Sequence, residues 1–371
     1  MIRLLCMLLL TSASCTRVNA EYCAADGDCG TGRRCDPEAH RCVAGVPLDG
    51  GADGAARDAA DDRRDGPGDL ADAADASPPD GADSDAPSCD VGFGGGCPEV
   101  LVDDDGADCA EAGYAVLQLA IDENPSAVIG VCAGTYGAIA VAGGDITLIG
   151  SDAGEARIAP LAGRAVDATG GALTIDGMTV EGAVDMMGHG VVCVEAEVAL
   201  RQVRVVSSGA RGVWAGDGCH LTIDRSFVEG NGDEGLKTTN VDELHVTNSF
   251  FVENGDDGVD LDVDLGAPFT FAHNTLVANG GDGATCATAL VLQNTLSSGN
   301  GDDIAGACAP LGECAGPSFD DAYHLAAGSP CIDEGVPSAV DVDYDGDARP
   351  LDGDGDGTPA HDVGADEYAP K

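Results

Sequence analysis

The densest group of metal-ligating side chains in this sequence is a run of aspartates between residues 254 and 264. Its members are Asp256, Asp257, Asp260, Asp262 and Asp264. Alternate residues of an extended strand point to the same side, so the last three are expected to project together. Carboxylates held so close repel one another unless a cation lies among them, and Ca²⁺ prefers carboxylate oxygen. The run therefore predicts a calcium site.

A second group of aspartates, near the C-terminus, follows the spacing of a calcium-binding loop. Positions 1, 3, 5 and 12 of that loop are Asp341, Asp343, Asp345 and Asp352, and position 6 is Gly346. A second string of this kind runs through Asp352, Asp354 and Asp356. Position 12 lacks the bidentate Glu of an EF-hand, and no flanking helices are indicated. The pattern predicts Ca²⁺ binding outside an EF-hand; a flexible acidic loop is the alternative.

The only tryptophan, Trp214, and one of the two lysines, Lys237, are the next candidates for chemistry. An aromatic ring offers a platform for the face of a sugar, and a cation or base can act beside it. Carboxylates nearby could hold Ca²⁺. Such a set suits a polysaccharide, provided that the fold brings its members to one face.

Repeated short strands indicate which fold positions these residues. Six segments can be aligned, and their starts lie 25, 23, 23, 25 and 21 residues apart. Each opens with two apolar residues separated by one position, which points both side chains inward on a strand. Asn-Gly turns close the later copies, and a second short strand follows each turn. The segments begin at Leu173, Val198, Leu221, Leu244, Phe269 and Leu290.

A repeat of this length without a helix predicts an all-β, parallel solenoid. One unit cannot bury its inner face alone, but units stacked about 4.8 Å apart bury a continuous aliphatic column. The pattern LxxLxLxxN of leucine-rich repeats is absent. The turn asparagines are expected to stack into a hydrogen-bonded ladder. One internal column is expected to contain Ile175, Leu200, Ile223, Val246, Phe271 and Leu292.

The same alternation predicts which residues of the second strand face outward. Because Val213, Leu236 and Val259 are expected to point inward, their neighbours form an outward column, with Asp262 beside it. That column would make Trp214 and Lys237 carbohydrate-binding residues. The alternative is a set of unrelated solvated side chains on a face that has to be polar. The members of the outward column are Val192, Trp214, Lys237, Asp260 and Thr285.

One amphipathic segment, residues 111–124, precedes the strands. Its spacing places Ala115, Leu119 and Asp122, or Val116, Leu119 and Ala120, on one helical face. A helix there would cover the open N-terminal edge of the solenoid, which would otherwise promote aggregation.

The first 20 residues have the features of a secretory signal, with Arg3 followed by an apolar stretch from Leu4 to Leu10. Two cleavage sites compete. The string from Ser12 to Cys15 resembles a bacterial lipobox, which would make Cys15 a lipid-bearing residue. Ordinary cleavage after Ala20 is the alternative.

An exported chain with this many cysteines is expected to form disulfides. Cys6 leaves with the signal and Cys15 is lipidated or lost, so 14 of the 16 remain. The first four of these fall in a compact segment, residues 21–44, where zinc is the alternative but no CxxC pair occurs. Nearest-neighbour spacing pairs Cys193 with Cys219, Cys286 with Cys308 and Cys314 with Cys331. The 14 are Cys23, Cys29, Cys35, Cys42, Cys89, Cys97, Cys109, Cys132, Cys193, Cys219, Cys286, Cys308, Cys314 and Cys331.

Composition limits the partners. The chain has 17 basic and 66 acidic residues, so its formal charge is 17 − 66 = −49, which argues against nucleic acid and against electrostatic docking on anionic lipid. Residues 45–88 are rich in Asp, Ala, Gly and Pro and lack the apolar residues for a core, so we expect a disordered stalk. No internal run of about 20 apolar residues indicates a membrane span. Membrane contact is expected only through a lipid at Cys15.

With these features, the chain resembles bacterial exported right-handed parallel β-helix proteins of the pectate-lyase-like fold. The resemblance covers residues 109–306 and rests on the expected helix cap, the strings VCAGTYGAIAV and ITLIG, and the aligned strands. The strings HLAAGSPCIDEG, DYDGDARP and DVGADEY resemble the segment that closes such proteins. The resemblance implies a right-handed parallel β-helix over residues 89–310 and an Asp-rich closing segment over 311–371.

The family contains lyases, hydrolases and members without known activity, so the fold does not settle the function. In a lyase of this family the base would be Lys or Arg, with Ca²⁺ between the substrate carboxylate and Asp. That role falls to Lys237, one rung from Asp260, although the same placement suits a plain salt bridge. Gly255-Asp256-Asp257 is similar to an acid/base string of family hydrolases, but the remaining strings are missing.

These observations favour a non-catalytic, monomeric β-helix on the cell surface that binds carbohydrate or another surface component, supported by Ca²⁺. The alternatives are a Ca²⁺-dependent uronan lyase with Lys237 as the catalytic base, and a purely structural surface protein.

Overall fold

The computed structural model describes residue 93 and residues 98–151, 155–320 and 322–370, together with the backbone of residues 33–36 and 41–44. The chain divides into two compact units, residues 1–81 and 82–371. In the first unit, strands β1 (Arg33–Asp36) and β2 (Arg41–Ala44) pair antiparallel and place Cys35 opposite Cys42. The rest of this section concerns the second unit.

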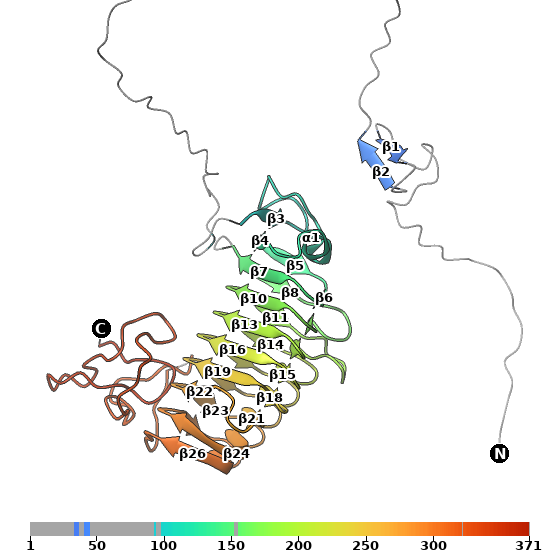
Figure 1. Ribbon diagram of the computed structural model, residues 1–371. Helices are drawn as coiled ribbons and strands as arrows, with labels where there is room; N and C mark the ends of the chain where they lie inside the picture. Colours follow the sequence, from blue (N-terminus) through green and yellow to red (C-terminus); the bar gives the residue numbers. More distant parts are fainter. Residues whose placement is uncertain are drawn as a thin grey trace, which may run out of the picture. The chain divides into compact units, whose positions relative to one another are not determined.

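The second unit is a parallel β-solenoid whose strands stack in three faces (Figure 1). The first face consists of β3 (Val100–Val102), β4 (Val128–Val131), β7 (Asp145–Gly150), β10 (Ala172–Asp176), β13 (Glu197–Arg201), β16 (His220–Asp224), β19 (Glu243–Thr247) and β22 (Phe269–Ala272). The second face consists of β5 (Gly134–Tyr136), β8 (Ala156–Ile158), β11 (Thr179–Glu181), β14 (Arg204–Val206), β17 (Phe227–Glu229), β20 (Phe250–Val252), β23 (Thr275–Val277) and β25 (Leu296–Ser298). The third face consists of β6 (Ile139–Val141), β9 (Val166–Ala168), β12 (Val191–Cys193), β15 (Val213–Ala215), β18 (Leu236–Thr238) and β21 (Val259–Leu261).

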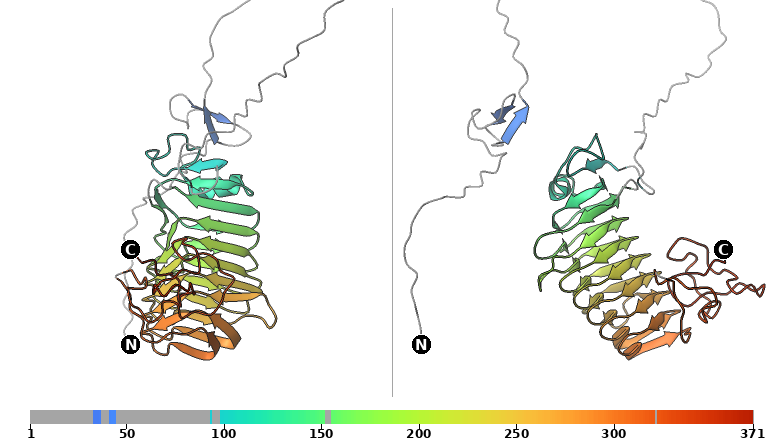
Figure 2. Two further views of the ribbon diagram at one scale, coloured as in Figure 1. Left: turned by 90° about the vertical axis from the view of Figure 1, so that its left-hand side faces the viewer. Right: turned by 180° about the vertical axis from the view of Figure 1, so that it is seen from behind.

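The long strand β24 (Ala284–Gln293) joins the first and third faces, because it pairs with both β22 and β21. Strand β26 (Ile304–Leu311) pairs with β24 and ends the stack. The strands of each face pair only in parallel, so each turn of the chain lies directly on the turn before it (Figure 2).

The internal column predicted from the repeat is confirmed. Ile175 pairs with Leu200, Leu200 with Ile223 and Ile223 with Val246. Val246 pairs with Phe271, and the pairing of Ala272 with Gln293 puts Leu292 next in register. All six side chains are buried. Continuous aliphatic burial of this kind supplies most of the stability of a fold that has few aromatic residues.

The asparagine ladder is also confirmed, and it lies inside the turns between the second and third faces. The side-chain amide of Asn231 donates to Oδ1 of Asn254 at 2.9 Å, and that of Asn254 donates to Oδ1 of Asn279 at 3.0 Å. Asn279 continues the ladder to Asn300 at 3.0 Å. The first three side chains are buried, so each rung fixes the turn of the next.

The N-terminal helix is shorter than predicted and turned about its axis. Helix α1 (Leu117–Glu123) contacts β3, β4 and β6, as a cap on the first rungs should. Its buried residues are Leu117, Ala120 and Ile121, whereas Leu119 and Val116 are 41% and 57% exposed. Both predicted faces centred on Leu119 were therefore wrong, because a helix of only two turns is oriented by the strand end it covers.

The C-terminal segment packs against the side of the solenoid (Figure 2). Its described residues after Leu311 form isolated antiparallel bridges, such as Val342 with Ala348. Leu325, Val363 and Ala365 pack on Phe250 and Leu296, which point outward from the second face. The expected closing segment thus covers a flank of the last rungs.

The C-terminal segment is held internally by a buried ion pair. Arg349 and Glu367 have fully buried side chains, and the guanidinium donates to the carboxylate at 2.6 Å. Arg349 also donates to the carbonyl oxygens of Gly364 and Ala365. These hydrogen bonds offset the desolvation of the two buried charges.

Four disulfides lie within the described residues. The three pairings predicted by spacing are confirmed, with Cα–Cα distances of 5.7 Å for Cys193–Cys219, 5.0 Å for Cys286–Cys308 and 5.1 Å for Cys314–Cys331. Cys109 and Cys132 form the fourth, at 6.2 Å. The side chains of Cys15, Cys23, Cys29, Cys35, Cys42, Cys89 and Cys97 lie outside the described residues. In the part of the chain that the structure describes, no helix is long and apolar enough to cross a bilayer.

Candidate functional site

The outward column predicted on the third face exists. Val192 pairs with Trp214, Trp214 with Lys237, Lys237 with Asp260 and Asp260 with Thr285. All except Val192 are partly exposed. Val192 has no exposed surface, because Arg164 spans the space between its two neighbours in the column, Asp167 and Trp214.

Trp214 is not an isolated ring. The guanidinium of Arg164 lies 5.8 Å from the ring centroid and is paired with Asp167 at 3.0 Å. The His189 ring lies 5.9 Å from the tryptophan at an interplanar angle of 38°. His189 is 7% exposed, and burial is the main cause that lowers its pKa, so the imidazole is neutral at pH 7. These contacts hold the indole in one orientation.

A second set of charged residues lies in the turns that enter the third face. We call it the turn column: Arg211, Glu234, Asp257 and Asp282, each three positions before a residue of the outward column. The turns stack, because the backbone N–H of Gly212, Gly235 and Gly258 donates to the carbonyl oxygen of Glu234, Asp257 and Asp282, respectively. Arg211 pairs with Glu234 at 2.8 Å, and the Asp257 carboxylate accepts the backbone N–H of Asp282 at 2.7 Å.

Lys237 lies between the two columns as an ion-pair partner. Its ammonium contacts the carboxylate of Asp260 in the outward column and lies 3.9 Å from that of Glu234 in the turn column. Of the two arrangements that the sequence left open for Lys237, the structure shows the salt bridge. Burial is the main cause that raises the pKa of the Asp257 carboxyl. The three cations of this surface, Arg164, Arg211 and Lys237, are thus each paired with at least one carboxylate.

The calcium site predicted in the middle aspartate run stays a prediction, and the structure shows where its residues lie. Asp260, Asp262 and Asp264 do point to the outer side, because they alternate with buried Leu261 and Val263. Within the described residues, however, no cluster of three ligand atoms within 4.8 Å contains two members of the run. Asp260 pairs with Lys237, and the backbone N–H of Asp262 donates to Thr238 at 2.7 Å.

One member of that run joins a different cluster. Asp256 lies within 4.8 Å of Asp233 and Glu234, which occupy the preceding turn. Asp233 and Glu234 also pair with Arg211, so part of their negative charge is already balanced.

The calcium loop predicted from the C-terminal aspartates also stays a prediction, and the carboxylates of the loop have different partners in the structure. Asp343 is fully buried, and its carboxylate accepts the backbone N–H of Asp347 at 2.7 Å and of Glu367 at 3.0 Å. The Asp343 carboxylate therefore provides hydrogen-bond acceptors for backbone N–H groups inside the C-terminal segment. Asp345 turns toward His324, while Asp352 and Asp354 meet Asp333 within 4.8 Å. The carboxylate of Asp356 accepts the backbone N–H of Thr358, and Asp341 enters the hydrogen bonds through its carbonyl oxygen.

Comparison with known families agrees with the architecture. Residues 165–311 match the family described as right handed beta helix region. The fold is a right-handed parallel β-helix. No curated protein matches the chain. Among solved structures, pectate lyase Pel9A is similar at 14% sequence identity and a TM-score of 0.40, covering 65% of this chain and 88% of that one.

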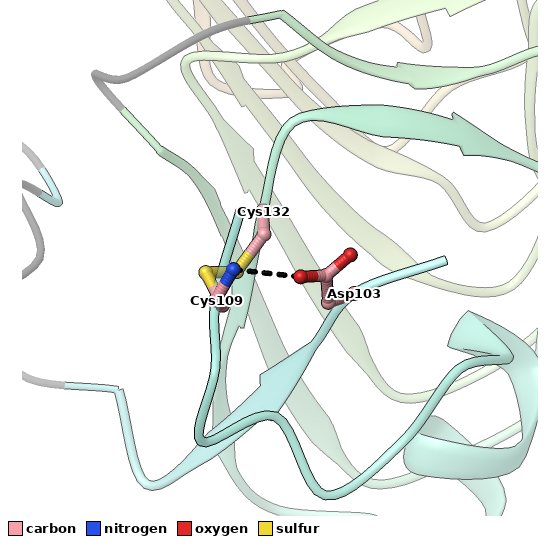
Figure 3. Close-up of side chains that lie close together, drawn as sticks. All are labelled: Asp103, Cys109 and Cys132. Carbon is pink, nitrogen blue, oxygen red and sulfur yellow. Dashed lines mark hydrogen bonds between the residues drawn. A yellow bond between two sulfur atoms is a disulfide. The ribbon is translucent and has the colours of Figure 1, made fainter. Parts of the chain in front are cut away.

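An acidic residue at the start of the β-helix has a structural role that the sequence did not indicate. Asp103 is 2% exposed and accepts backbone N–H bonds from Asp105, Gly106 and Asp108. It also accepts the backbone N–H of Cys109 (Figure 3). Burial alone would raise the pKa of this carboxyl, but the four donors outweigh it and the pKa is lowered.

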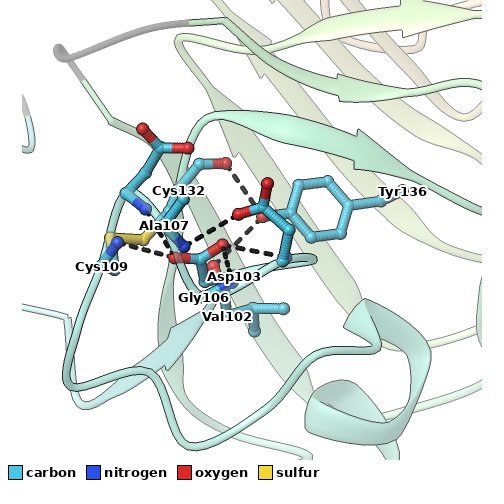
Figure 4. The surroundings of a disulfide bond; sticks show 9 residues. Val102, Asp103, Gly106, Ala107, Cys109, Cys132 and Tyr136 are labelled. Atoms are coloured by element: carbon cyan, nitrogen blue, oxygen red, sulfur yellow. Dashed lines mark hydrogen bonds between the residues drawn. A yellow bond between two sulfur atoms is a disulfide. The ribbon is translucent and has the colours of Figure 1, made fainter.

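The neighbouring Cys109–Cys132 disulfide and Tyr136 complete this knot (Figure 4). The Tyr136 hydroxyl donates to the carbonyl oxygen of Cys132 at 2.9 Å and lies 3.2 Å from that of Val102. Burial raises the pKa of Tyr136, so the hydroxyl stays protonated. With every group engaged in the fold, the knot anchors the first rungs of the β-helix.

Sequence reasoning missed Arg164, His189, Arg211 and Glu234 at the third-face surface. Arg211 and Glu234 are separated by the same 23 residues as Trp214 and Lys237, so the repeat contained a signal for them. Arg164 and His189 lie in loops whose conformation does not follow from the repeat.

Proposed function

We propose that this protein is a non-catalytic, carbohydrate-binding β-helix, and that the surface around Trp214 is its binding site. One observation carries the proposal: the Trp214 indole is held by Arg164, and the charged residues Lys237 and Asp260 occupy the same position on the next two strands of the third face. Sugars pack their C–H faces on aromatic rings and bind charged side chains through their hydroxyl groups. The strands of the third face hold Trp214, Lys237 and Asp260, so little ordering energy is lost on binding.

The arrangement of Lys237 supports binding over catalysis. A lysine base must offer a neutral amine to the proton beside a uronate carboxylate. Here the ammonium is engaged by Asp260 and Glu234, and it would have to leave both carboxylates first. The remaining cations of the surface, Arg164 and Arg211, are paired as well.

The Ca²⁺-dependent uronan lyase remains the second candidate, favoured by the position of Lys237 one rung from Asp260. It is tested by the absorbance of unsaturated product from pectate or alginate, with Ca²⁺ and with a chelator. We expect no product. Product that is lost in Lys237→Ala would establish the lyase and overturn the non-catalytic proposal.

We further propose that the protein acts outside the cell as a monomer, on a stalk, and that Ca²⁺ supports its C-terminal segment. Disulfides support an oxidising compartment. The Asp333, Asp352 and Asp354 carboxylates support the calcium assignment, because their oxygens converge. The mass of the mature N-terminus distinguishes lipid at Cys15 from cleavage after Ala20, and thermal unfolding with Ca²⁺ or a chelator tests the ion.

The binding proposal is tested by tryptophan fluorescence, since Trp214 is the only indole in the chain. Titration with neutral, cationic and anionic oligosaccharides is expected to shift the emission with at least one class. Calorimetry with that ligand should then show a loss of about 2- to 12-fold in affinity for Trp214→Ala, from the stacking energy alone. Tyr114→Ala, a partly buried aromatic near α1, is the matched control and should bind as the parent does. Absence of any emission change across the panel would favour the purely structural alternative.

A further inference from the structure

A mixed cluster of one imidazole and two carboxylates lies in the C-terminal segment, away from the third face. His324 Nδ1 is 3.2 Å from Oδ1 of Asp366 and 3.6 Å from Oδ2 of Asp345. One ligand atom from each of the three residues lies within 4.8 Å of the other two. The three come from separate stretches of the segment, so the cluster is a product of its tertiary fold.

Each member except Asp345 is held in place by other contacts. The second oxygen of Asp366 accepts the backbone N–H of Leu325 at 3.0 Å, and the Asp366 side chain is only 10% exposed. The His324 ring packs against Phe250 of β20 at 5.6 Å and against Tyr344 at 5.8 Å between centroids. Asp345 lies in the loop that the bridge between Val342 and Ala348 closes, and its side chain is 54% exposed. Two ligand positions are therefore fixed, and the third can adjust.

Hydrogen bonding within the protein does not account for this convergence. Nδ1 of histidine carries at most one hydrogen and can bond one carboxylate, which is Asp366 here. At 3.6 Å, Asp345 lies beyond hydrogen-bond range of the same nitrogen. Two carboxylates thus share one donor in a chain of formal charge −49, and a divalent cation that replaces the Nδ1 proton would stabilise both of them.

The distances match those between the ligands of a small divalent cation. Ligands 2.0–2.1 Å from a tetrahedral metal lie about 3.3 Å from one another. The measured separations of 3.2 and 3.6 Å bracket that value. A nitrogen with two carboxylate oxygens is a donor set for Zn²⁺ or a similar transition metal, whereas Ca²⁺ takes oxygen ligands.

The cluster also opens on a cavity. A hollow of about 690 Å³ is lined by His324, Asp345 and Asp366 together with Asp320 and Asp347. Its acidic lining would attract a cation, and its volume leaves room for water at a fourth ligand position.

We propose that His324, Asp345 and Asp366 bind a divalent transition metal, with Zn²⁺ as the best fit. The metal joins three stretches of the C-terminal segment and, through the His324 ring, ties them to Phe250 on the second face. The site is independent of the carbohydrate proposal, because it shares no residue with the third face.

The test is Zn²⁺ binding by the full chain, measured by calorimetry with millimolar Mg²⁺ present to occupy the other acidic surfaces. We expect one tight site per chain, a rise in the unfolding temperature on loading, and a visible absorption band with Co²⁺. The variant is Asp345→Asn, which changes the exposed ligand and leaves the two fixed ones in place. Asp347→Asn is the matched control: it lines the same cavity, and its side chain lies outside the cluster.

A loss of more than 10-fold in Zn²⁺ affinity for Asp345→Asn, with the control within about twofold of the parent, would support the site. His324→Gln, which keeps the shape of the side chain, should abolish the Co²⁺ band. Equal losses in both Asp variants, or a Co²⁺ spectrum unchanged by His324→Gln, would overturn the proposal and assign the binding to diffuse acidic surface.

Discussion

The asparagine ladder allows a quantitative test of how the turns of this β-helix are held, and Asn254→Ala is its sharpest perturbation. Asn254 lies in the middle of the ladder and is 2% exposed. Its turn leads directly into β21, which carries Asp260 of the outward column. Removing the amide should therefore loosen both the stack and the surface that we propose for binding.

The magnitude follows from the bonds that are lost. Oδ1 of Asn254 accepts the backbone N–H of Asn231 at 3.2 Å and its side-chain amide at 2.9 Å. Its own amide donates to the carbonyl oxygen of Val228 at 3.2 Å and to Asn279. Asn279 keeps a second donor, the backbone N–H of Asn254, at 3.1 Å. Three buried groups are left without this partner, at about 1–3 kcal/mol each, so we expect a loss of at least about 3 kcal/mol.

The assay is denaturant unfolding with the disulfides intact, followed by amide hydrogen exchange of the turns. Thr174→Ala, on the outer side of β10, is the control and should stay within about 0.5 kcal/mol of the parent. Exchange protection should fall at Asn231 and its neighbours before it falls elsewhere. A loss below about 1 kcal/mol for Asn254→Ala would refute the ladder as a source of stability.

Three further outcomes are expected. Burial lowers the pKa of His273 to about 2, so below pH 6.5 the unfolded chain binds a proton there and the folded chain does not. The free energy of unfolding should therefore fall by about 1.4 kcal/mol per pH unit below pH 6.5. His273→Gln should reduce that slope in urea unfolding measured between pH 7 and 5. Phe250→Ala should cost about 3–5 kcal/mol and expose residues 312–370 to protease, because this ring joins the segment to the second face; an unchanged digestion pattern would contradict that packing. Non-reducing peptide maps should contain Cys193–Cys219, Cys286–Cys308 and Cys314–Cys331, and free thiols at these positions would argue against an oxidising compartment.

The columns could be predicted from the repeat because, in a solenoid, residues one repeat apart in the sequence are neighbours in space. Residues about one repeat apart pair on adjacent strands, so the inward column from Ile175 to Leu292 and the outward column from Trp214 to Thr285 followed from alternation alone. The same rule explains why disulfides one rung apart could be paired from spacing.

Sequence spacing does not fix side-chain directions outside the repeat. The calcium-loop pattern from Asp341 to Asp352 matched in sequence, yet Asp343 is buried as a cap and Asp345 faces His324. Irregular chain after β26 takes its conformation from the surface of the second face, on which it packs, and local sequence does not encode that surface. The orientation of α1 failed for the same reason.

The sequence by itself determined the class of fold, the inward and outward columns and the asparagine ladder, because each rests on contacts between equivalent positions of neighbouring repeats. It also paired three disulfides, because the two cysteines of each pair are near neighbours in the sequence. Only the tertiary structure decided that Lys237 is held by Asp260 and Glu234, that Arg164 and His189 contact Trp214, and that His324 meets Asp345 and Asp366. Those contacts join loops and an irregular segment to the repeats, and their geometry depends on packing between parts of the chain that share no period.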